Sequence, residues 1–146
     1  MKSDGLQPDL VAYNALIGAG MTAERPVEVF GLWQEMCQSS NENVSPDIVT
    51  LTEVIATLDS AIGKANRERV DSVFEEAVSR GLILRKDSLD TSWEVDLHSM
   101  SFPVARAACR YIFQQIVKNN SGNGDDEAVK DLNLITGAGR MREYVR

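Results

Sequence analysis

The sequence has few cysteines and no long apolar run. Cys37 and Cys109 are its only cysteines and lie far apart, which excludes a disulfide scaffold and a cysteine-rich zinc module. We expect both to be half-buried thiols. No apolar stretch approaches the ~20 residues that a membrane-spanning helix needs. The sequence therefore argues against an integral membrane protein, and we expect no membrane partner.

An excess of basic residues is also missing. The net charge of −7 argues against indiscriminate binding of nucleic acids, which requires lysine and arginine against phosphates. The acidity belongs to residues 1–91, which carry 8 basic and 15 acidic side chains. Residues 92–146 carry 7 of each and end in a basic stretch. The chain is not uniform, and two kinds of module are expected.

Two proline–aspartate pairs predict a repeat. Residues 5–11, GLQPDLV, recur loosely 38 residues later as residues 43–49, NVSPDIV. This spacing is close to the ~34 residues of helical-hairpin repeats, and each pair is expected to open a helix. Apolar stripes then predict three of the four helices. One stripe contains Leu51, Val54, Ile55, Leu58 and Ile62. A second, after Pro26, contains Phe30, Trp33, Met36 and Cys37. The third, before Gly81, contains Val70, Val73, Phe74, Ala77 and Val78. The alternative is an unrelated arrangement of four helices.

The first ninety residues resemble the pentatricopeptide repeat family. Residues 11–17, VAYNALI, look like the opening of its first helix, and residues 30–36, FGLWQEM, look like the close of its second. Extra residues around 39–43 and 61–66 are expected to fall in loops. The resemblance divides this part of the chain into residues 1–9, the tail of a preceding repeat, and two repeats over 10–47 and 48–85, the second divergent. On this interpretation Met1 is not the natural start.

The resemblance also implies single-stranded RNA as partner. In that family two or three side chains of each repeat read one base. The matching positions of the first repeat are Asn14 and Asp47, whose amide and carboxylate can together hydrogen-bond a base edge. Thr52 is the first matching position of the second repeat, and its partner falls near Arg85, where the usual Asn or Asp is missing. The alternative for Asn14 is a capping or solvent-facing amide.

After a polar linker at residues 86–92 the periodicity changes. Trp93, Val95 and Leu97 alternate with Glu94, Asp96 and His98, which predicts a half-buried strand with the polar residues on one face. A helix is expected from Ser101 or Pro103 to about Lys118, followed by a loop over 119–127. Residues 132–136 predict a second strand, which Gly137 stops.

Strand, helix and strand at this length predict a parallel pair joined by a right-handed crossover. Asp96, His98 and residues 136–140 should then meet at one edge of the sheet, where ligands of open α/β sheets bind. Gly137 and Gly139 would let the backbone approach a phosphate, and Arg140 would add a charged donor. Taken singly, His98 is most simply a structural histidine.

This combination resembles the small MutS-related (Smr) domain. Residues 95–99, VDLHS, match its first motif, and residues 134–140, LITGAGR, match its second. Ser99 replaces a common glycine, and Met141-Arg142 replaces a polar pair. The domain would occupy residues 93–146 and be truncated at its carboxy end. The predicted fold is thus an α-solenoid of helical hairpins followed by a partial two-layer α/β domain.

The two resemblances imply an RNA-binding protein of chloroplasts or mitochondria, with the Smr domain binding and cleaving RNA or, as an alternative, DNA. Asp96 would bind a divalent metal ion or orient a nucleophile, with Glu94 and His98 as further metal ligands. His98 would carry a proton. The phosphate would be held by Gly137, Gly139, Arg140 and Arg142. The rival interpretations are a non-catalytic RNA-binding module and a helical scaffold for protein partners.

Overall fold

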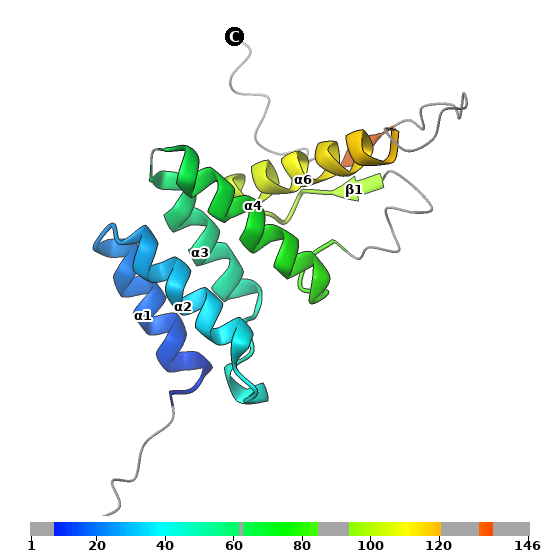
Figure 1. Ribbon diagram of the computed structural model, residues 1–146. Coiled ribbons are helices and arrows are strands. Elements are labelled where there is room, and N and C mark those ends of the chain that lie inside the picture. The colour runs from blue at the N-terminus through cyan, green and yellow to red at the C-terminus, as the bar shows by residue number, and fades with distance from the viewer. Residues whose placement is uncertain (1–7, 62, 85–93, 121–131, 136–146) are drawn as a thin grey trace, which may run out of the picture. The chain divides into compact units, whose positions relative to one another are not determined.

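The computed structural model describes residues 8–61, 63–84, 94–120 and 132–135 (Figure 1). Over these ranges the chain is mostly helical, with five α-helices and a small two-stranded parallel sheet. The predicted combination of helices and a parallel strand pair is therefore confirmed at this level. The chain forms two compact units, one up to Phe74 and one from Glu75 onward. The predicted linker lies outside the described residues.

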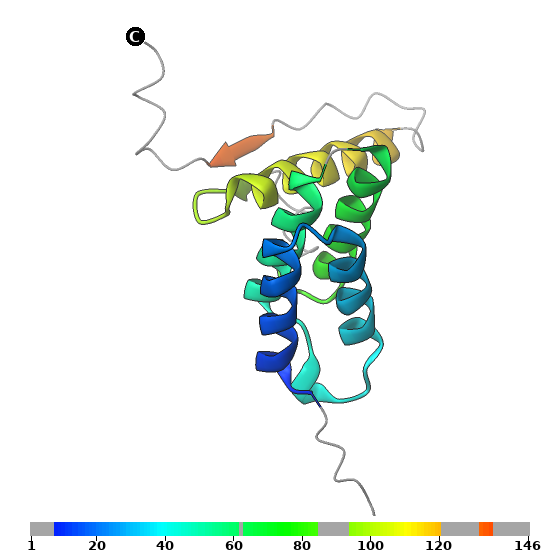
Figure 2. The same cartoon turned by 90° about the vertical axis from the view of Figure 1, so that its left-hand side faces the viewer.

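The first two helices form an antiparallel hairpin. Helix α1 spans Leu10–Thr22, and helix α2 spans Pro26–Gln38. The Asp9 carboxylate begins α1 by accepting a hydrogen bond from the Ala12 amide at 2.9 Å, as expected of an N-cap. Pro26 begins α2, where its missing N–H leaves no helical partner unpaired. Figure 2 shows the two helices side by side, running in opposite directions.

The second hairpin begins in the same way as the first. After a short 3₁₀ turn, η1 (Glu42–Val44), helix α3 spans Ile48–Ser60. Asp47 caps α3, so both predicted proline–aspartate helix starts are confirmed and lie 38 residues apart. Helices α1 and α3 have the same length of 13 residues. Helix α3 packs against both α1 and α2 (Figure 1).

Helix α4 spans Lys64–Ser79 and ends as predicted near Gly81. Gly81 has a φ of +71° and its amide bonds the Val78 carbonyl, while the Leu82 amide bonds the Ala77 carbonyl. These two bonds are a Schellman cap, which favours glycine at the left-handed position. The extra residues between the two helices were expected in a loop. They lie in the helix instead, because α4 has 16 residues and α2 has 13.

The predicted stripes are buried almost completely. Four residues of the α3 stripe and all five of the α4 stripe are buried, whereas Ile62 lies outside the described residues. In α2, Trp33 and Met36 are buried, and Phe30 and Cys37 are half-buried. The structure adds Val29, which the predicted stripe left out and which is fully buried. Helical periodicity thus located most of the core.

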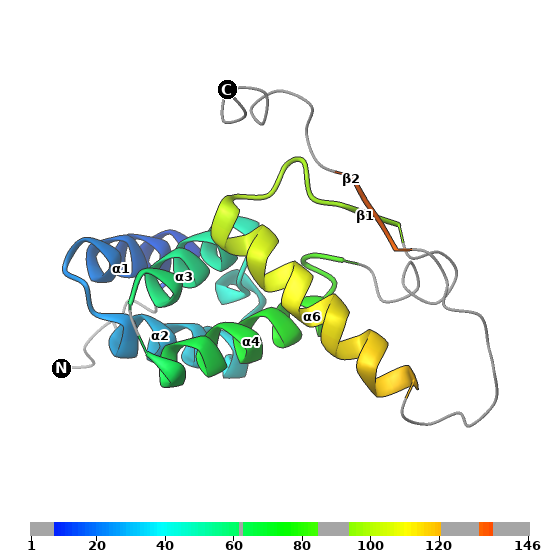
Figure 3. The same ribbon diagram turned by 90° about the horizontal axis from the view of Figure 1, so that it is seen from above.

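In the second unit, strands β1 (Glu94–Asp96) and β2 (Asn133–Ile135) lie side by side and parallel (Figure 3). Val95 pairs with Leu134, and Asp96 pairs with Ile135. The predicted parallel pairing is confirmed. Helix α6 spans Phe102–Asn120, two residues beyond the predicted end, so the start of the expected loop is helical. The rest of that loop lies outside the described residues.

Both cysteines are half-buried thiols, as expected. Within the part of the chain that the structure describes, no helix is both long enough and apolar enough to cross a membrane.

Close packing of α1 against α2 depends on Gly20. A Cβ atom at this position would lie 2.5 Å from Cγ2 of Val29, whereas a Cβ at Gly18 would meet nothing within 4 Å. We expect Gly20→Ala to lower the free energy of unfolding by about 1–2 kcal/mol, because overpacking outweighs the helix propensity of alanine. Gly18→Ala should raise it by about 0.5–1 kcal/mol. Urea unfolding of the full chain measures both, and equal stabilisation by the two changes would contradict this packing.

Candidate functional site

The structure brings the predicted base-reading pair together. Asn14 lies on α1 and is half-buried, and Asp47 lies at the N-cap of α3. Between them lies the Thr50 hydroxyl, 2.7 Å from Asn14 Oδ1 and 2.9 Å from Asp47 Oδ1. This hydroxyl has one proton to donate to the two oxygens. The amide and the carboxylate, 33 positions apart in the sequence, therefore share one polar cluster.

Capping geometry holds Asp47 in place. Its carboxylate accepts the Thr50 amide at 2.8 Å, and its own amide donates to the Thr50 hydroxyl at 3.3 Å. Together these bonds form a capping box, which satisfies two backbone donors at the start of α3. The position of the carboxylate is thus a consequence of the helix start, and α3 packs against α1, which carries Asn14.

The Asp47 carboxyl is held in its ionised form. Burial raises its pKa, because desolvation disfavours the charge. Four hydrogen bonds together outweigh that effect: those from the amide and the hydroxyl of Thr50, from the Val49 amide and from the Asn14 side chain. The pKa therefore lies below its ordinary value of 3.8. At neutral pH the cluster presents a carboxylate acceptor beside an amide.

Thr50 is a member of this cluster that the sequence analysis missed. A signal for it exists, because threonine three residues after a capping aspartate is a reciprocal capping pattern. Its contact with Asn14 has no local signal, since it joins two helices across 36 positions. Asp9 rather than Asn14 caps α1, and the half-buried Asn14 side chain accepts the Thr50 hydroxyl through Oδ1.

The predicted readout position of the second repeat has a different environment. Thr52 lies on α3 at the position equivalent to Asn14 on α1, 38 residues later. Its hydroxyl donates to the carbonyl of Ile48 at 2.8 Å. Its predicted partner near Arg85 lies outside the described residues. The structure thus describes both members of the first predicted pair and one member of the second.

A second polar pair lies at the end of β1. The Asp96 carboxylate accepts hydrogen bonds from the His98 amide at 2.9 Å and from His98 Nδ1 at 2.7 Å. These two bonds to His98 lower the pKa of Asp96. Val95 and Leu97 are buried, whereas Asp96 and His98 are exposed, so the predicted alternation is confirmed for these four residues. The side chains of Trp93 and Glu94 lie outside what the structure describes. The His98 ring is oriented by Asp96 and remains open to solvent.

This pair lies at the sheet edge that the sequence predicted. The Leu97 amide donates a hydrogen bond to the Ile135 carbonyl at 2.8 Å. Ile135, at the end of β2, therefore lies beside the segment of chain that carries Asp96 and His98. The predicted phosphate-binding residues follow Ile135 in the sequence. All of them lie outside the described residues: Gly137, Gly139, Arg140 and Arg142. Their contribution to this edge stays a prediction.

No metal centre is found in the described ranges. Among those residues, no three His, Cys, Asp or Glu side chains are grouped so that they could hold a metal ion. The side chain of Glu94, one of the three candidate ligands, lies outside what the structure describes. A metal site at Glu94, Asp96 and His98 therefore stays a prediction, and the described contacts of Asp96 are those with His98.

Comparisons with protein-family models, with curated proteins and with solved structures found no match for this chain.

Removing the Asp47 carboxylate tests the cluster. At pH 7 we expect Asp47→Ala to lower the free energy of unfolding by about 1–2 kcal/mol, because it removes an N-cap and the acceptor of the Thr50 hydroxyl. Asp9→Ala is the matched control. It removes an exposed cap whose one described side-chain bond is to Ala12 and should cost about 0.5–1 kcal/mol. Urea unfolding curves of the three chains measure the difference.

The effect of Asp47 should depend on pH. Its folded pKa lies below the unfolded value, so the ionised carboxylate stabilises the fold above about pH 4. This contribution is lost as the pH falls through the folded pKa. The difference in stability between the parent chain and Asp47→Ala should therefore shrink as the pH is lowered from about 5 to below the folded pKa. A difference that is constant over this range would contradict the ionised cluster.

Proposed function

We propose that this chain binds single-stranded RNA through its helical hairpins, as a pentatricopeptide-repeat protein that continues into an Smr domain. The observation that carries the proposal is the contact of Asn14 and Asp47 with one hydroxyl, that of Thr50. The two residues that sequence resemblance nominated as a base-reading pair are neighbours in space. Equal starts and lengths of α1 and α3 support the repeat. By the same resemblance we propose RNA processing in a chloroplast or mitochondrion.

The chemistry of the pair suits uracil. A carboxylate accepts hydrogen bonds, and an amide both donates and accepts them. Uracil presents an N–H donor next to a carbonyl acceptor, so its edge can bond the Asp47 carboxylate and the Asn14 amide at the same time. Because the Thr50 hydroxyl already fixes one oxygen of each side chain, little ordering is needed when a base binds.

Binding by the full chain should be weak, dependent on salt and selective for uracil. Fluorescence anisotropy with labelled poly-U and poly-A oligonucleotides measures it. Two phosphate contacts would reduce affinity about 7-fold between 50 and 200 mM salt. Asn14→Thr should reduce the preference for poly-U over poly-A by about fivefold or more, because it removes the amide.

The matched control for this test is Asn43→Thr, at an exposed asparagine of η1 outside the cluster. It should leave the preference for poly-U unchanged. If Asn14→Thr also leaves it unchanged, the pair does not read a base. If the parent chain binds neither oligonucleotide at any salt concentration, the RNA-binding proposal is wrong and the helical scaffold for protein partners replaces it.

A second candidate function, cleavage of RNA, rests on the pair Asp96 and His98. With Nδ1 directed at the Asp96 carboxylate, the other ring nitrogen, Nε2, can exchange a proton with an attacking hydroxyl. Asp96 would orient the ring. The residues proposed to hold the phosphate are those that follow β2, with Arg140 as the charged donor. The alternative is a module that binds RNA without cleaving it.

The cleavage proposal predicts a selective loss in Asp96→Asn, which keeps the side-chain shape and removes the charge. Cleavage of a labelled RNA by the full chain should fall about 10²–10³-fold, while the affinity for RNA changes less than about twofold. His98→Ala should change the pH dependence of the residual rate. Glu75→Gln, which removes an exposed carboxylate of the same unit, is the control. Full cleavage by Asp96→Asn would show that Asp96 takes no part in the reaction, and binding without cleavage by the parent chain would leave the non-catalytic module as the explanation.

A further inference from the structure

One side of helix α6 carries exposed aromatic rings together with a cation. Phe102 is 75% exposed, Phe113 57% and Val117 64%, and Arg106 is exposed as well. These four residues stand at positions i, i+4, i+11 and i+15 of the helix. At 3.6 residues per turn they fall within an arc of about 60°. They are called the outer face of α6 below.

The opposite side of α6 is the one that the fold uses. Its apolar residues are buried: Val104, Ala107, Ala108 and Ile112. The rings of the outer face are therefore not needed to hold the helix in place. Exposed apolar side chains that gather on one face of a folded protein indicate an interaction site.

Phe102 and Arg106 form one stacked pair on this face. The guanidinium carbon of Arg106 lies 5.5 Å from the centroid of the Phe102 ring, within the range of a cation–π interaction. The guanidinium covers one face of the ring, and because Phe102 is so exposed, the other face is open to a planar group. Nucleic-acid bases stack on such rings, and arginine beside them contributes a cation–π contact.

The charge of α6 favours an anionic ligand. The helix contains Arg106, Arg110 and Lys118 and no acidic residue, although the whole chain has a net charge of −7. Arg106 and Lys118 are exposed, and Arg110 is half-buried. Aromatic rings beside cations are the combination to which single-stranded nucleic acids bind, with bases on the rings and phosphates on the cations.

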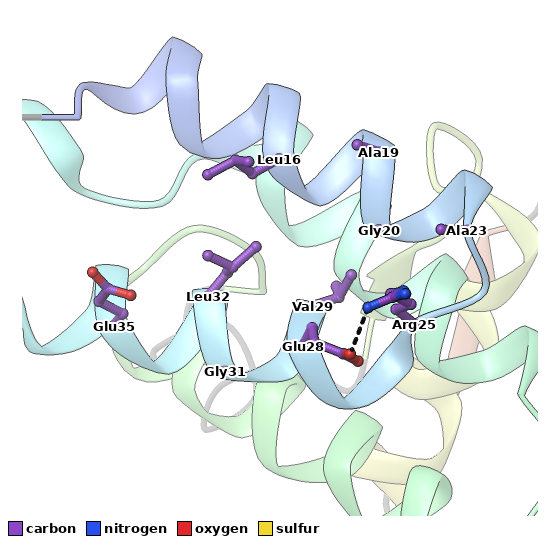
Figure 4. A pocket seen from close by; sticks show the side chains of 10 residues that line it. All are labelled: Leu16, Ala19, Gly20, Ala23, Arg25, Glu28, Val29, Gly31, Leu32 and Glu35. Carbon is purple, nitrogen blue, oxygen red and sulfur yellow. Dashed lines mark hydrogen bonds and ion pairs between the residues drawn. The ribbon is translucent and has the colours of Figure 1, made fainter.

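The first unit has an apolar surface of different character. An open groove of about 530 Å³ lies between α1 and α2, and Leu16 and Leu32 are directed into it (Figure 4). The carboxylates of Glu28 and Glu35 line this groove together with Arg25, whose charge is paired with Glu28 at 3.3 Å. A phosphate in the groove would be repelled by the excess of negative charge. Charge therefore favours α6 over the groove for an anionic ligand.

The outer face of α6 suits RNA better than a lipid surface. A helix that lies in a lipid interface keeps a continuous apolar face toward the acyl chains. The continuous apolar face of α6 is buried in the fold, and on the outer face Arg106 lies between Phe102 and Phe113. Insertion into lipid would remove water from this charge, whereas a stacked base would contact it.

We propose that the outer face of α6 is a second contact surface for single-stranded RNA. One base stacks on Phe102 and another on Phe113, while Arg106 and Lys118 contact phosphates. Stacking does not depend on the identity of the base, so this surface adds affinity without selecting uracil. The inference rests on the proposed binding of RNA and extends it from the hairpins to α6.

The spacing of the two rings is compatible with one strand. Phe102 and Phe113 are eleven residues apart, which is about 16.5 Å along a helix. A stacked strand crosses this distance in about five nucleotides, at ~3.4 Å each. Phe102 also follows His98 by four residues, so their Cα atoms are at most about 14 Å apart. A strand on the outer face would therefore pass near the candidate cleavage pair.

Two substitutions at Phe102 test the stacking, measured by fluorescence anisotropy of labelled poly-U and poly-A oligonucleotides with the full chain. Phe102→Leu keeps an apolar side chain but removes the ring. It should weaken the binding of both oligonucleotides about fivefold, because one stacked base is lost. Phe102→Trp keeps a ring and should bind both at least as tightly as the parent chain. Equal affinities of the parent chain and Phe102→Leu would overturn the proposal.

Arg106→Gln tests the phosphate contact. Each contact of a single strand contributes about 0.7 to the slope of log affinity against log salt concentration. The change should therefore make this slope shallower by about 0.7. Arg25→Gln is the matched control, because this arginine is paired with Glu28 in the other unit, and it should leave the slope unchanged. Equal decreases in the two variants would show an effect of net charge alone and contradict a contact at α6.

This proposal and base reading by the hairpins fail in different ways. If Asn14→Thr reduces the preference for poly-U while Phe102→Leu leaves both affinities unchanged, the hairpins bind RNA and α6 does not. If the parent chain binds neither oligonucleotide, both proposals are wrong.

Vesicles of phosphatidylserine and phosphatidylcholine in equal parts separate RNA from lipid. The full chain should not sediment with them. Sedimentation with the vesicles that Phe113→Asp abolishes would show that the outer face binds a lipid surface, and it would overturn the assignment to RNA.

Discussion

The Asp47 carboxylate connects the start of α3 to the side chain proposed to read a base. It accepts a hydrogen bond from the Thr50 amide at the helix start, and the Thr50 hydroxyl donates a hydrogen bond to Asn14 of α1. Burial of this charge is unfavourable, and the hydrogen bonds that it receives more than offset the effect on its ionisation. One carboxylate therefore starts a helix, joins two hairpins and remains ionised. A change there alters stability and recognition together.

Asp9 and Asp47 show how tertiary context changes a shared local signal. Both follow a proline, both cap a helix of 13 residues, and both accept a backbone amide three residues ahead. Asp9 is exposed, whereas Asp47 is half-buried and belongs to a cluster. Asp47 is more buried than Asp9 because its helix, α3, packs against α1 and α2. The apolar residues at one pair of equivalent positions differ in the same way, since Leu16 of α1 is exposed and Val54 of α3 is buried.

The features that could be predicted from the sequence are those that depend on neighbouring residues. Proline–aspartate pairs predicted two helix starts, periodicity predicted most of the core, and alternation predicted that Asp96 and His98 are exposed. The role of Thr50 could not be predicted in full, since its contact with Asn14 depends on how two helices pack. Nor could the groove, because Leu16 fits an apolar pattern as well as Val54 does, and only its neighbours decide its exposure.

Helix α4 shows why a repeat of unequal length can keep its core. Relative to α2 it has three additional residues, and three residues are close to the 3.6 of one helical turn. An insertion of nearly one turn lengthens the helix but returns the chain to almost the same face. Phe74 therefore takes the place of Trp33, and Ala77 that of Met36, with all four buried. The two hairpins thus keep the direction of their buried faces. They differ in side-chain volume, because alanine is smaller than methionine. An insertion of two residues would have rotated the face by about 200° and exposed this stripe. The length of the insertion, more than its location in a loop, is what the packing of the hairpin constrains.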